Sequence, residues 1–414
     1  MPEAKTPLDI VAQFYASTIN DTNPCTFYLA AYLKETVNPH ILQTAVNDLI
    51  IRLPFLNGRI KQDLFHHYNQ YNAYQPNPIQ IEKSNSLNTF TTCHKRGRDP
   101  LFKVLYNENG FKLETTHIIC DGRAIVKIME ALLVRYYELQ GISINKNGII
   151  HCAEKLKPEE LENAFEKYTQ SIPAKDAREA FTRYTKAQNS GKPKTVYQNP
   201  NPNPANSRTI TSKHSVKQLK AAAKQYNATI TELITAYIFK AIAEERQTDT
   251  TPIAIMIPVD FRTFYPSETL GTFVQGKPIY MTEVGELPEI LEHIKTQFKA
   301  ITPESVSDEI IGFYKIFNFM KFIPLVIKRR ILKIMKRSGS AGNTTMFSNL
   351  GLVKLPLEIE AHLSTFEFAI CPESEYEGYV FSCVAVGDSL SLTISTNENG
   401  EDTVANLVKL LNNN

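Results

Sequence analysis

The amino-acid sequence predicts an α/β fold built as two lobes. Its 414 residues exceed the usual size of one domain, and 43% of them are hydrophobic, which is enough for sizeable cores. Residues 111–114 alternate apolar and charged side chains, as a half-buried strand does, and a helical pattern follows them. The second half repeats this mixture, with a continuous apolar run over residues 253–259. Strands and helices in both halves favour an α/β plan.

The first half is expected to begin with a short helix at residues 8–20 and a strand at residues 26–30. A helical stripe covers residues 39–52, with a proline near its start, where proline is tolerated. The strand-like segment at residues 111–117 leads into an amphipathic helix after Gly122. The apolar stripe of that helix comprises Ile125, Ile128, Met129, Leu132, Leu133 and Tyr136.

The second half is expected to begin with a strand and two helices. One helix covers residues 215–226, and the next begins near Thr229 or Thr231, either of which can cap it. The apolar run at residues 253–259 is a buried strand that delivers Arg262 just beyond its end. Further strands are predicted at residues 208–211, 345–348, 365–369, 380–384 and 390–394, and a last helix at residues 402–411.

A change of composition separates the halves. Alternating Asn and Pro over residues 199–204 favour extended chain that packs poorly. We therefore predict an N-terminal lobe at residues 1–165, a crossover at residues 166–208 and a C-terminal lobe at residues 209–414.

Charge and composition argue against several classes of protein. The 45 Lys and Arg against 43 Asp and Glu leave a net charge of +2, which is unlike a dedicated nucleic-acid binder. The N-terminus lacks the apolar run of a signal peptide, and no apolar stretch reaches the length of a membrane span. The motifs G-x-x-x-x-G-K-[ST], G-x-G-x-x-G and G-x-S-x-G are absent, so nucleotide hydrolysis, dinucleotide chemistry and a serine hydrolase have no support.

The six cysteines are scattered along the chain. They show neither C-x-x-C spacing nor histidine partners at the spacing of a zinc site, so we expect no bound metal. Reduced thiols in the cytosol are the default for such cysteines, which favours a cytoplasmic protein.

The candidate catalytic residue is His117, which ends the strand-like segment just before a turn containing Asp121 and Gly122. By strand alternation, His117 points the same way as the apolar side chains. A side chain at such a junction is held by rigid elements yet reaches open space, as a catalytic base requires. The alternative is a histidine satisfied within the core, with Asp121 serving only as a helix N-cap.

Residues 116–122 resemble the H-x-x-x-D-G signature of the acyltransferase superfamily that contains peptide-synthetase condensation domains, chloramphenicol acetyltransferase and plant BAHD acyltransferases. Residues 258–270 and 348–351 resemble segments of its bacterial alcohol-acetyltransferase-like and polyketide-associated branch, and residues 42–54 look like the opening of the first lobe. Thr116 stands where many condensation domains carry a second histidine, which weakens an amide-forming interpretation. The chain has no Trp, so the BAHD D-F-G-W-G segment is absent.

The resemblance implies two chloramphenicol-acetyltransferase-like lobes forming a V, with a tunnel between them that the two substrates enter from opposite faces. His117 would then be the general base that takes a proton from the attacking acceptor. Asp121 would form an ion pair with Arg262 that fixes the loop carrying His117, because a buried carboxylate needs such a partner. Gly122 would let the backbone approach closely where the helix begins.

The resemblance also implies the substrates. The donor would be an acyl-CoA or an acyl group on the phosphopantetheine of a carrier protein, with no bound cofactor. The acceptor would be a small or lipid-like alcohol, which places the chain in secondary-metabolite or lipid biosynthesis. Ser348 and Asn349 could donate hydrogen bonds to the reacting carbonyl or the pantetheine arm, with strand-end capping as the alternative. Two other functions stay open: a stand-alone condensation enzyme that forms an amide, and an idle condensation-like binding module.

One stretch lies outside this scheme. Residues 313–337 contain eight Lys and Arg and no acid, interspersed with Ile, Leu, Phe and Met. A basic amphipathic stretch can lie on an anionic membrane or dock an acidic carrier protein. The interpretation we favour is a solvated helix whose apolar face covers the second lobe, with peripheral membrane contact or carrier docking as the alternative.

Overall fold

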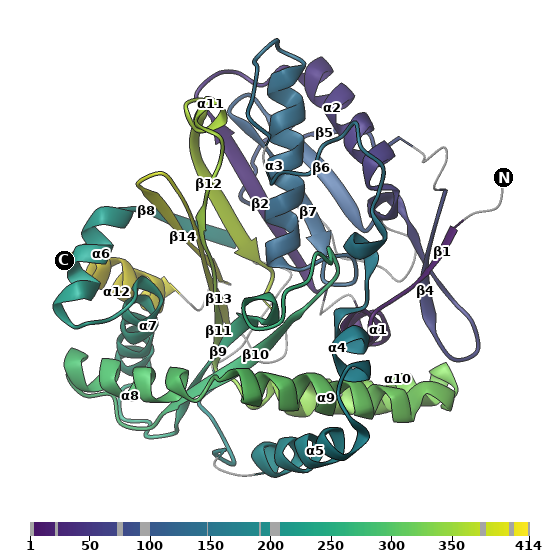
Figure 1. The fold of residues 1–414 in the computed structure, drawn as a ribbon. Coiled ribbons are helices and arrows are strands. Elements are labelled where there is room, and N and C mark those ends of the chain that lie inside the picture. The colour runs from purple at the N-terminus through teal and green to yellow at the C-terminus, as the bar shows by residue number, and fades with distance from the viewer. Residues whose placement is uncertain are drawn as a thin grey trace.

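The structure is a computed structural model that describes residues 4–20, 24–72, 78–91, 100–146, 148–189, 192–198, 208–372, 378–396 and 401–412. In this part of the chain, two large sheets and one small sheet are surrounded by helices, which confirms the predicted α/β class (Figure 1). The Asn/Pro tract at residues 199–204 and Cys93 lie outside the described residues. The division of the chain at residues 165 and 208 stays a prediction.

The first large sheet has five strands, in the order β12 (Leu363–Ile370), β2 (Thr26–Leu33), β7 (Gly110–Thr116), β6 (Phe102–Asn107) and β5 (Glu82–Lys83). Helices α2 (Pro39–Arg52) and α3 (Gly122–Glu138) pack against each other and share one hydrophobic core with this sheet. Figure 1 shows both helices at the top of the molecule, with α3 crossing the face of the sheet. The apolar stripe predicted after Gly122 is buried in this core.

The second large sheet has six strands, in the order β10 (Val274–Met281), β9 (Ile253–Asp260), β11 (Thr345–Val353), β13 (Tyr379–Val386), β14 (Ser389–Thr396) and β8 (Arg208–Ser215). Its core is shared with helices α6 (Val216–Gln225), α7 (Ile230–Arg246), α8 (Leu287–Lys299) and α12 (Glu401–Asn412). Strand β11 lies between β9 and β13 and runs parallel to both, whereas the other pairs in this sheet are antiparallel.

One strand joins the two halves of the sequence. β12 comes from the second half, yet it pairs antiparallel with β2 of the first sheet, placing Ala369 opposite Tyr28. Tyr28 donates a hydrogen bond of 2.5 Å to Glu367 of β12, so the pairing is also fixed through side chains. The C-terminal part of the chain therefore completes the sheet of the N-terminal part.

The remaining elements lie beside and beneath the sheets. A small antiparallel sheet has the order β1 (Ala4–Pro7), β4 (His67–Tyr71) and β3 (Arg59–Gln62). Helices α9 (Pro303–Phe319) and α10 (Leu325–Ser340) run across the lower part of the molecule in Figure 1. The other short elements are α1 (Ile10–Thr18), α4 (Ala164–Gln170), α5 (Ala174–Asn189), α11 (Leu357–Glu360) and the 3-10 turns at Pro54–Asn57, Pro158–Leu161, Phe261–Thr263 and Met320–Phe322.

Most predicted elements are present within a few residues of their expected ends. The helix predicted at residues 39–52 is α2, and Thr229 caps α7 in a capping box with Glu232. The strand predicted at residues 111–117 ends at Thr116, so His117 lies in the following turn and not on the face of the strand. Strand β10 and helix α8 were not predicted.

The basic stretch at residues 313–337 is not one helix. It comprises the end of α9, a 3-10 turn and most of α10, which begins after Pro324. The interpretation that its apolar face covers the second lobe holds only for the end of α9, where Phe313 and Tyr314 pack against Phe261 and Phe273. Helix α10 instead packs against α1, and Leu332 joins a core cluster with Phe14. Among the described helices, none combines the length and hydrophobicity that crossing a bilayer requires.

Candidate active site

His117 is fixed through its backbone on both sides. Its N–H donates to the carbonyl of Cys25 at 3.1 Å, and its own carbonyl accepts from the Thr272 hydroxyl at 3.1 Å. Cys25 has a φ of 51°, in the left-handed region that non-glycine residues rarely adopt. The turn after β7 is therefore held by residues from both halves of the sequence, which limits how far the imidazole can move.

Two aromatic rings hold the imidazole of His117. Tyr15 of α1 stacks on it with ring centroids 5.1 Å apart and planes 19° apart, and Phe27 of β2 lies 4.5 Å away. The side chain is half-buried and borders the cavity described below. The ring is thus oriented by contacts on its faces and reaches space where a substrate can lie.

Asp121 is fully buried, and both of its carboxylate oxygens accept hydrogen bonds from other groups of the protein. One carboxylate oxygen, Oδ1, accepts the N–H groups of Arg123 and Ala124, which makes Asp121 the N-cap of α3. The other, Oδ2, accepts from the Arg262 guanidinium at 2.7 Å and from the Phe273 N–H at 2.9 Å. Four donors on two oxygens fix the carboxylate in place, so Asp121 is a positioning residue.

Arg262 lies in the 3-10 turn after β9, and its side chain is 9% exposed. Besides Asp121, it donates to Asp260 at 3.0 Å and to the carbonyls of Thr269 and Gly271 at 3.0 and 2.8 Å. Burial alone would lower the pKa of Arg262, but the charges of Asp121 and Asp260 outweigh it and raise the pKa. The predicted ion pair between Asp121 and Arg262 is therefore present.

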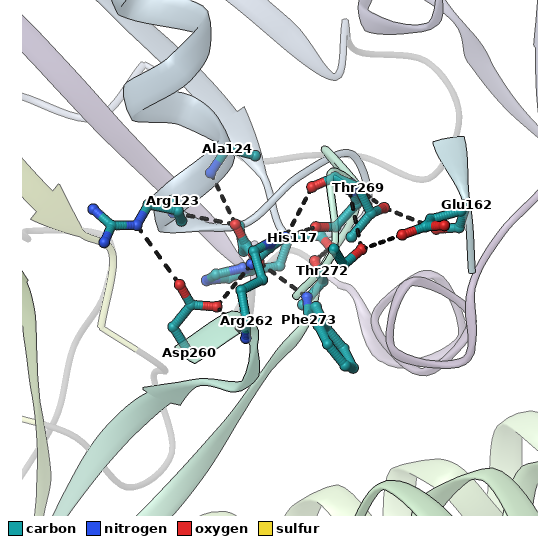
Figure 2. Close-up of polar contacts among 12 residues, drawn as sticks. His117, Arg123, Ala124, Glu162, Asp260, Arg262, Thr269, Thr272 and Phe273 are labelled. Atoms are coloured by element: carbon teal, nitrogen blue, oxygen red, sulfur yellow. Dashed lines mark hydrogen bonds and ion pairs between the residues drawn. The ribbon is translucent and has the colours of Figure 1, made fainter. Parts of the chain in front are cut away.

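The segment after Arg262 is tied to Glu162, near the end of the predicted N-terminal lobe (Figure 2). The Thr269 hydroxyl donates to the carbonyl of Glu162 at 2.8 Å, and the Ser267 hydroxyl donates to the Glu162 carboxylate at 2.5 Å. Arg123 reaches Asp260 at 3.6 Å from the opposite side. Figure 2 shows Arg262 next to His117, with Arg123 and Asp260 on one side and Thr269 and Glu162 on the other.

A cavity of about 980 Å³ adjoins His117 and is lined by residues from both halves of the chain. Gly122 and Arg123 border it from the first half, and Ser348 and Asn349 of β11 border it from the second. Its volume lies in the upper range for pockets that hold small molecules and cofactors. The cavity thus brings together every residue predicted for the site except Asp121 and Arg262, which stand behind its wall.

Gly122 packs closely against β11. A Cβ at this position would lie 2.7 Å from the Leu350 side chain of β11. Asn349 uses its amide within the protein, because it donates to the Thr231 hydroxyl at 2.9 Å and accepts from the Gly351 N–H at 2.7 Å. Gly351 has a φ of 76° at the irregularity of β11. Asn349 therefore shapes the strand end, and Ser348 is the better placed of the two to meet a substrate.

Two further residues at the site could not be predicted from the sequence. Tyr15 stacks on His117, and Lys336 of α10 places its ammonium 5.6 Å from the centre of the Tyr15 ring and 3.4 Å from the Cys25 sulfur. Both border the cavity. No short motif surrounds either residue, and only the apolar spacing of α1 and α10 could have indicated that these helices pack together.

Among the described residues, no group of three or more His, Cys, Asp or Glu side chains could hold a metal ion. Cys152 is an unpaired thiol whose pKa burial raises to about 12, and burial also raises the pKa of Cys120 and Cys383. Thiols that resist ionisation are poor nucleophiles, so these three cysteines are structural.

A family model described as alcohol acetyltransferase matches residues 79–414. The fold is similar to the epimerization domain from the third module of tyrocidine synthetase B, with a TM-score of 0.67 and 13% identity over 100% of this chain and 95% of that one. It is also similar to the trichothecene 15-O-acetyltransferase of Fusarium sporotrichioides, with a TM-score of 0.67 and 11% identity over 99% and 94%.

Polyketide synthase associated protein 5 of Mycobacterium tuberculosis is similar as well, with a TM-score of 0.62 and 12% identity over 99% of this chain and 98% of that one. No curated protein sequence matches the chain. At these identities, the structural likeness shows the fold, which is that of the superfamily containing condensation domains and acetyltransferases. The superfamily expected from the sequence is thereby confirmed.

Proposed function

This chain belongs to the alcohol acetyltransferase family, and from that premise we propose that it transfers an acyl group from a pantetheine thioester to an alcohol, with His117 as the general base. The observation that carries the proposal is the placement of His117, whose ring borders a cavity of about 980 Å³ while its backbone is held by Cys25 and Thr272. A neutral imidazole in such a place can accept the proton of a substrate hydroxyl.

The reaction needs no covalent enzyme intermediate. The hydroxyl proton passes to the His117 imidazole while the hydroxyl oxygen bonds to the thioester carbonyl carbon, and the carbonyl electron pair moves onto its oxygen. When that pair returns, the thiolate leaves and takes the proton back from the imidazolium. The products are an ester and the pantetheine thiol, and general-base help of this kind contributes about 10²–10⁴-fold.

The other residues support this step in different ways. Asp121 and Arg262 position the turn that carries His117, and Gly122 lets β11 approach it. Ser348 borders the cavity and is the candidate donor to the carbonyl oxygen as negative charge develops there. The donor would be either an acyl-CoA or an acyl group on a carrier protein, and the acceptor a small or lipid-like alcohol.

The test is turnover by the purified chain on a panel of acyl-CoAs and acyl-carrier proteins with alcohols, beside His117→Ala. We expect His117→Ala to lose about 10²–10⁴-fold in kcat. His40→Ala is the matched control, because His40 is an exposed histidine on α2, and it should leave turnover unchanged.

Three results would contradict the proposal. Equal turnover by wild type and His117→Ala would reject the assigned base. Amines reacting faster than alcohols would favour the amide-forming alternative. Absence of turnover on every donor, with a donor or acceptor still retained by both proteins, would favour an idle binding module.

A further inference from the structure

The exposed apolar side chains of this molecule are concentrated on one surface. Among the described residues, ten large hydrophobic side chains are exposed, and six of them fall between residues 319 and 335: Phe319, Phe322, Val326, Ile327, Ile334 and Met335. Phe319 is 83% exposed and Phe322 is 78% exposed. Single exposed apolar residues are normal, but six of them within 17 residues of one helical segment mark a surface that meets another phase or partner.

Helix α10 has two clearly different faces. Leu325, Lys328 and Leu332 recur at three and four and are buried, and Lys328 donates to the Phe65 carbonyl at 2.7 Å. Val326, Arg330 and Lys333 recur in the same way on the exposed face. Apolar and cationic side chains are thus interleaved on the outer face of the helix.

The eight cations of residues 313–337 divide between the inside and the outside. Four are directed into the protein: Lys315 donates to the Ala177 carbonyl, Lys328 to Phe65, Arg329 to Gln62, and Lys336 borders the cavity. The others, namely Lys321, Arg330, Lys333 and Arg337, are exposed. We call these four, together with Phe319, Phe322, Val326, Ile327 and Ile334, the α9–α10 surface.

We propose that the α9–α10 surface docks the protein on an anionic lipid bilayer. The charge complementarity is direct, because residues 313–337 contain cations and no acid. Each Lys or Arg near an anionic bilayer strengthens binding about fivefold, and the apolar side chains between them can enter the boundary between headgroups and acyl chains. Asp63, an acid in the neighbouring turn, accepts the N–H groups of Phe65 and His66.

An acidic carrier protein is the other partner that cations of this kind suit. Recognition of a carrier by charge would use Lys321, Arg330 and Lys333, but it would leave Phe319 and Phe322 exposed at about four-fifths of their area. A bilayer accounts for both sets of side chains at once. Leu64, which is 65% exposed and whose carbonyl accepts the Leu325 N–H, extends the apolar group beside the start of α10.

The α9–α10 surface lies on the helix that also borders the cavity. Met335 and Lys336 of α10 line the cavity, and Lys336 lies over the Tyr15 ring that stacks on His117. Docking would therefore bring the cavity close to the lipid phase. Resting on the proposed function, this placement suits an acceptor alcohol that partitions into lipid.

The test is co-sedimentation of the purified full chain with vesicles of phosphatidylcholine, with and without phosphatidylglycerol. We expect binding only to the anionic vesicles, weakened by salt. The double substitution F319S with F322S, and separately the triple substitution K321Q, R330Q and K333Q, should each lower the binding constant at least about tenfold. L357S is the matched control, because Leu357 is 80% exposed on α11, outside this surface, and it should bind like wild type.

Turnover on a water-soluble alcohol should be unchanged in both multiple variants. The docking proposal and the proposed function can therefore be rejected separately, the first by vesicle binding and the second by turnover. Equal binding of wild type and F319S with F322S would overturn the proposal. The proposal would also be overturned if the wild type bound a holo-acyl-carrier protein and not anionic vesicles. In that case the triple substitution K321Q, R330Q and K333Q should abolish carrier binding, and F319S with F322S should not. Thermal unfolding of each variant checks that the substitutions, all at exposed positions, leave the fold intact.

Discussion

The Asp121–Arg262 centre and the α9–α10 surface use charge in opposite ways. At the centre, four donors surround the Asp121 carboxylate, and Arg262 is shared among Asp121, Asp260 and two backbone carbonyls. On the α9–α10 surface, Arg330 and Lys333 stand exposed among apolar side chains that are exposed as well. A buried charge whose hydrogen-bond partners all lie within the protein keeps the neighbouring residues in place. An exposed charge beside exposed apolar side chains is available to another molecule.

Removing Arg262 should produce the largest effect. Arg262→Met would leave the buried Asp121 carboxylate without its cation, which costs about 3–5 kcal/mol of the free energy of unfolding. Urea denaturation measures this loss, and turnover should fall with it because the turn carrying His117 is released. A loss below about 1 kcal/mol would mean that the centre does not anchor the site.

A second buried ion pair supplies the control for Arg262→Met. Arg52 donates to both oxygens of Glu160 at 2.6 and 2.8 Å, with its side chain fully buried. Arg52→Met should therefore cost a similar free energy of unfolding, yet turnover per folded molecule should be kept, because Arg52 is not part of the cavity wall. If both variants lost turnover equally, the centre would be no more than another structural pair.

The second largest effect is expected at Asp9, a half-buried residue beside the centre. Burial, aided by the charge of Asp121, raises the pKa of Asp9 to about 6, although the N–H groups of Val11 and Ala12 oppose this. The folded protein then binds this proton more tightly than the unfolded chain does, so the contribution of Asp9 to the free energy of unfolding falls as pH rises from about 4 to about 6.

Asp9→Asn keeps a good N-cap without the charge and should flatten that dependence. At pH 7 it should raise the free energy of unfolding by about 1–3 kcal/mol, since each pKa unit corresponds to about 1.36 kcal/mol. Urea denaturation at pH 4 and pH 7 checks both expectations. If the free energy of unfolding of wild type rose from pH 4 to pH 7 relative to that of Asp9→Asn, both expectations would be contradicted.

The smallest effect is expected at Tyr15, which lies between the two regions. Tyr15→Leu removes the ring that stacks on His117 and faces Lys336, and an aromatic contact contributes about 0.5–1.5 kcal/mol. We expect kcat to fall about tenfold and the free energy of unfolding to change little. Tyr15→Phe keeps the ring and should behave like wild type; loss of turnover in that variant would assign the role to the hydroxyl instead.

The secondary structure around the site could be predicted from the sequence because it depends on local patterns of apolar residues. Alternation up to Thr116, the helical stripe after Gly122 and the apolar run of β9 placed His117 and Arg262 at the ends of strands. The partnership of Asp121 with Arg262, which are 141 positions apart, came from resemblance to a family, and the 2.7 Å contact bears it out. Local periodicity carries no information about such a pairing.

The parts that the sequence did not reveal depend on packing between distant elements. Tyr15 and Lys336 meet at His117 only because α1 packs against α10. Likewise, the basic stretch was interpreted as one helix, but α10 begins only after Pro324. Lys328 is directed inward because it donates to the carbonyl of Phe65 in a neighbouring turn. Nothing in the spacing of either region distinguishes a cation that faces inward from one that faces out.

The strand that passes from the second half into the first sheet has a consequence for how the chain is synthesised. Until the ribosome has released residues 363–370, the backbone edge of β2 that β12 will cover has no partner. An exposed strand edge of this kind invites pairing with other chains. The nascent protein therefore spends most of its translation with an open edge, and truncation before β12 should yield aggregates and not a folded N-terminal fragment.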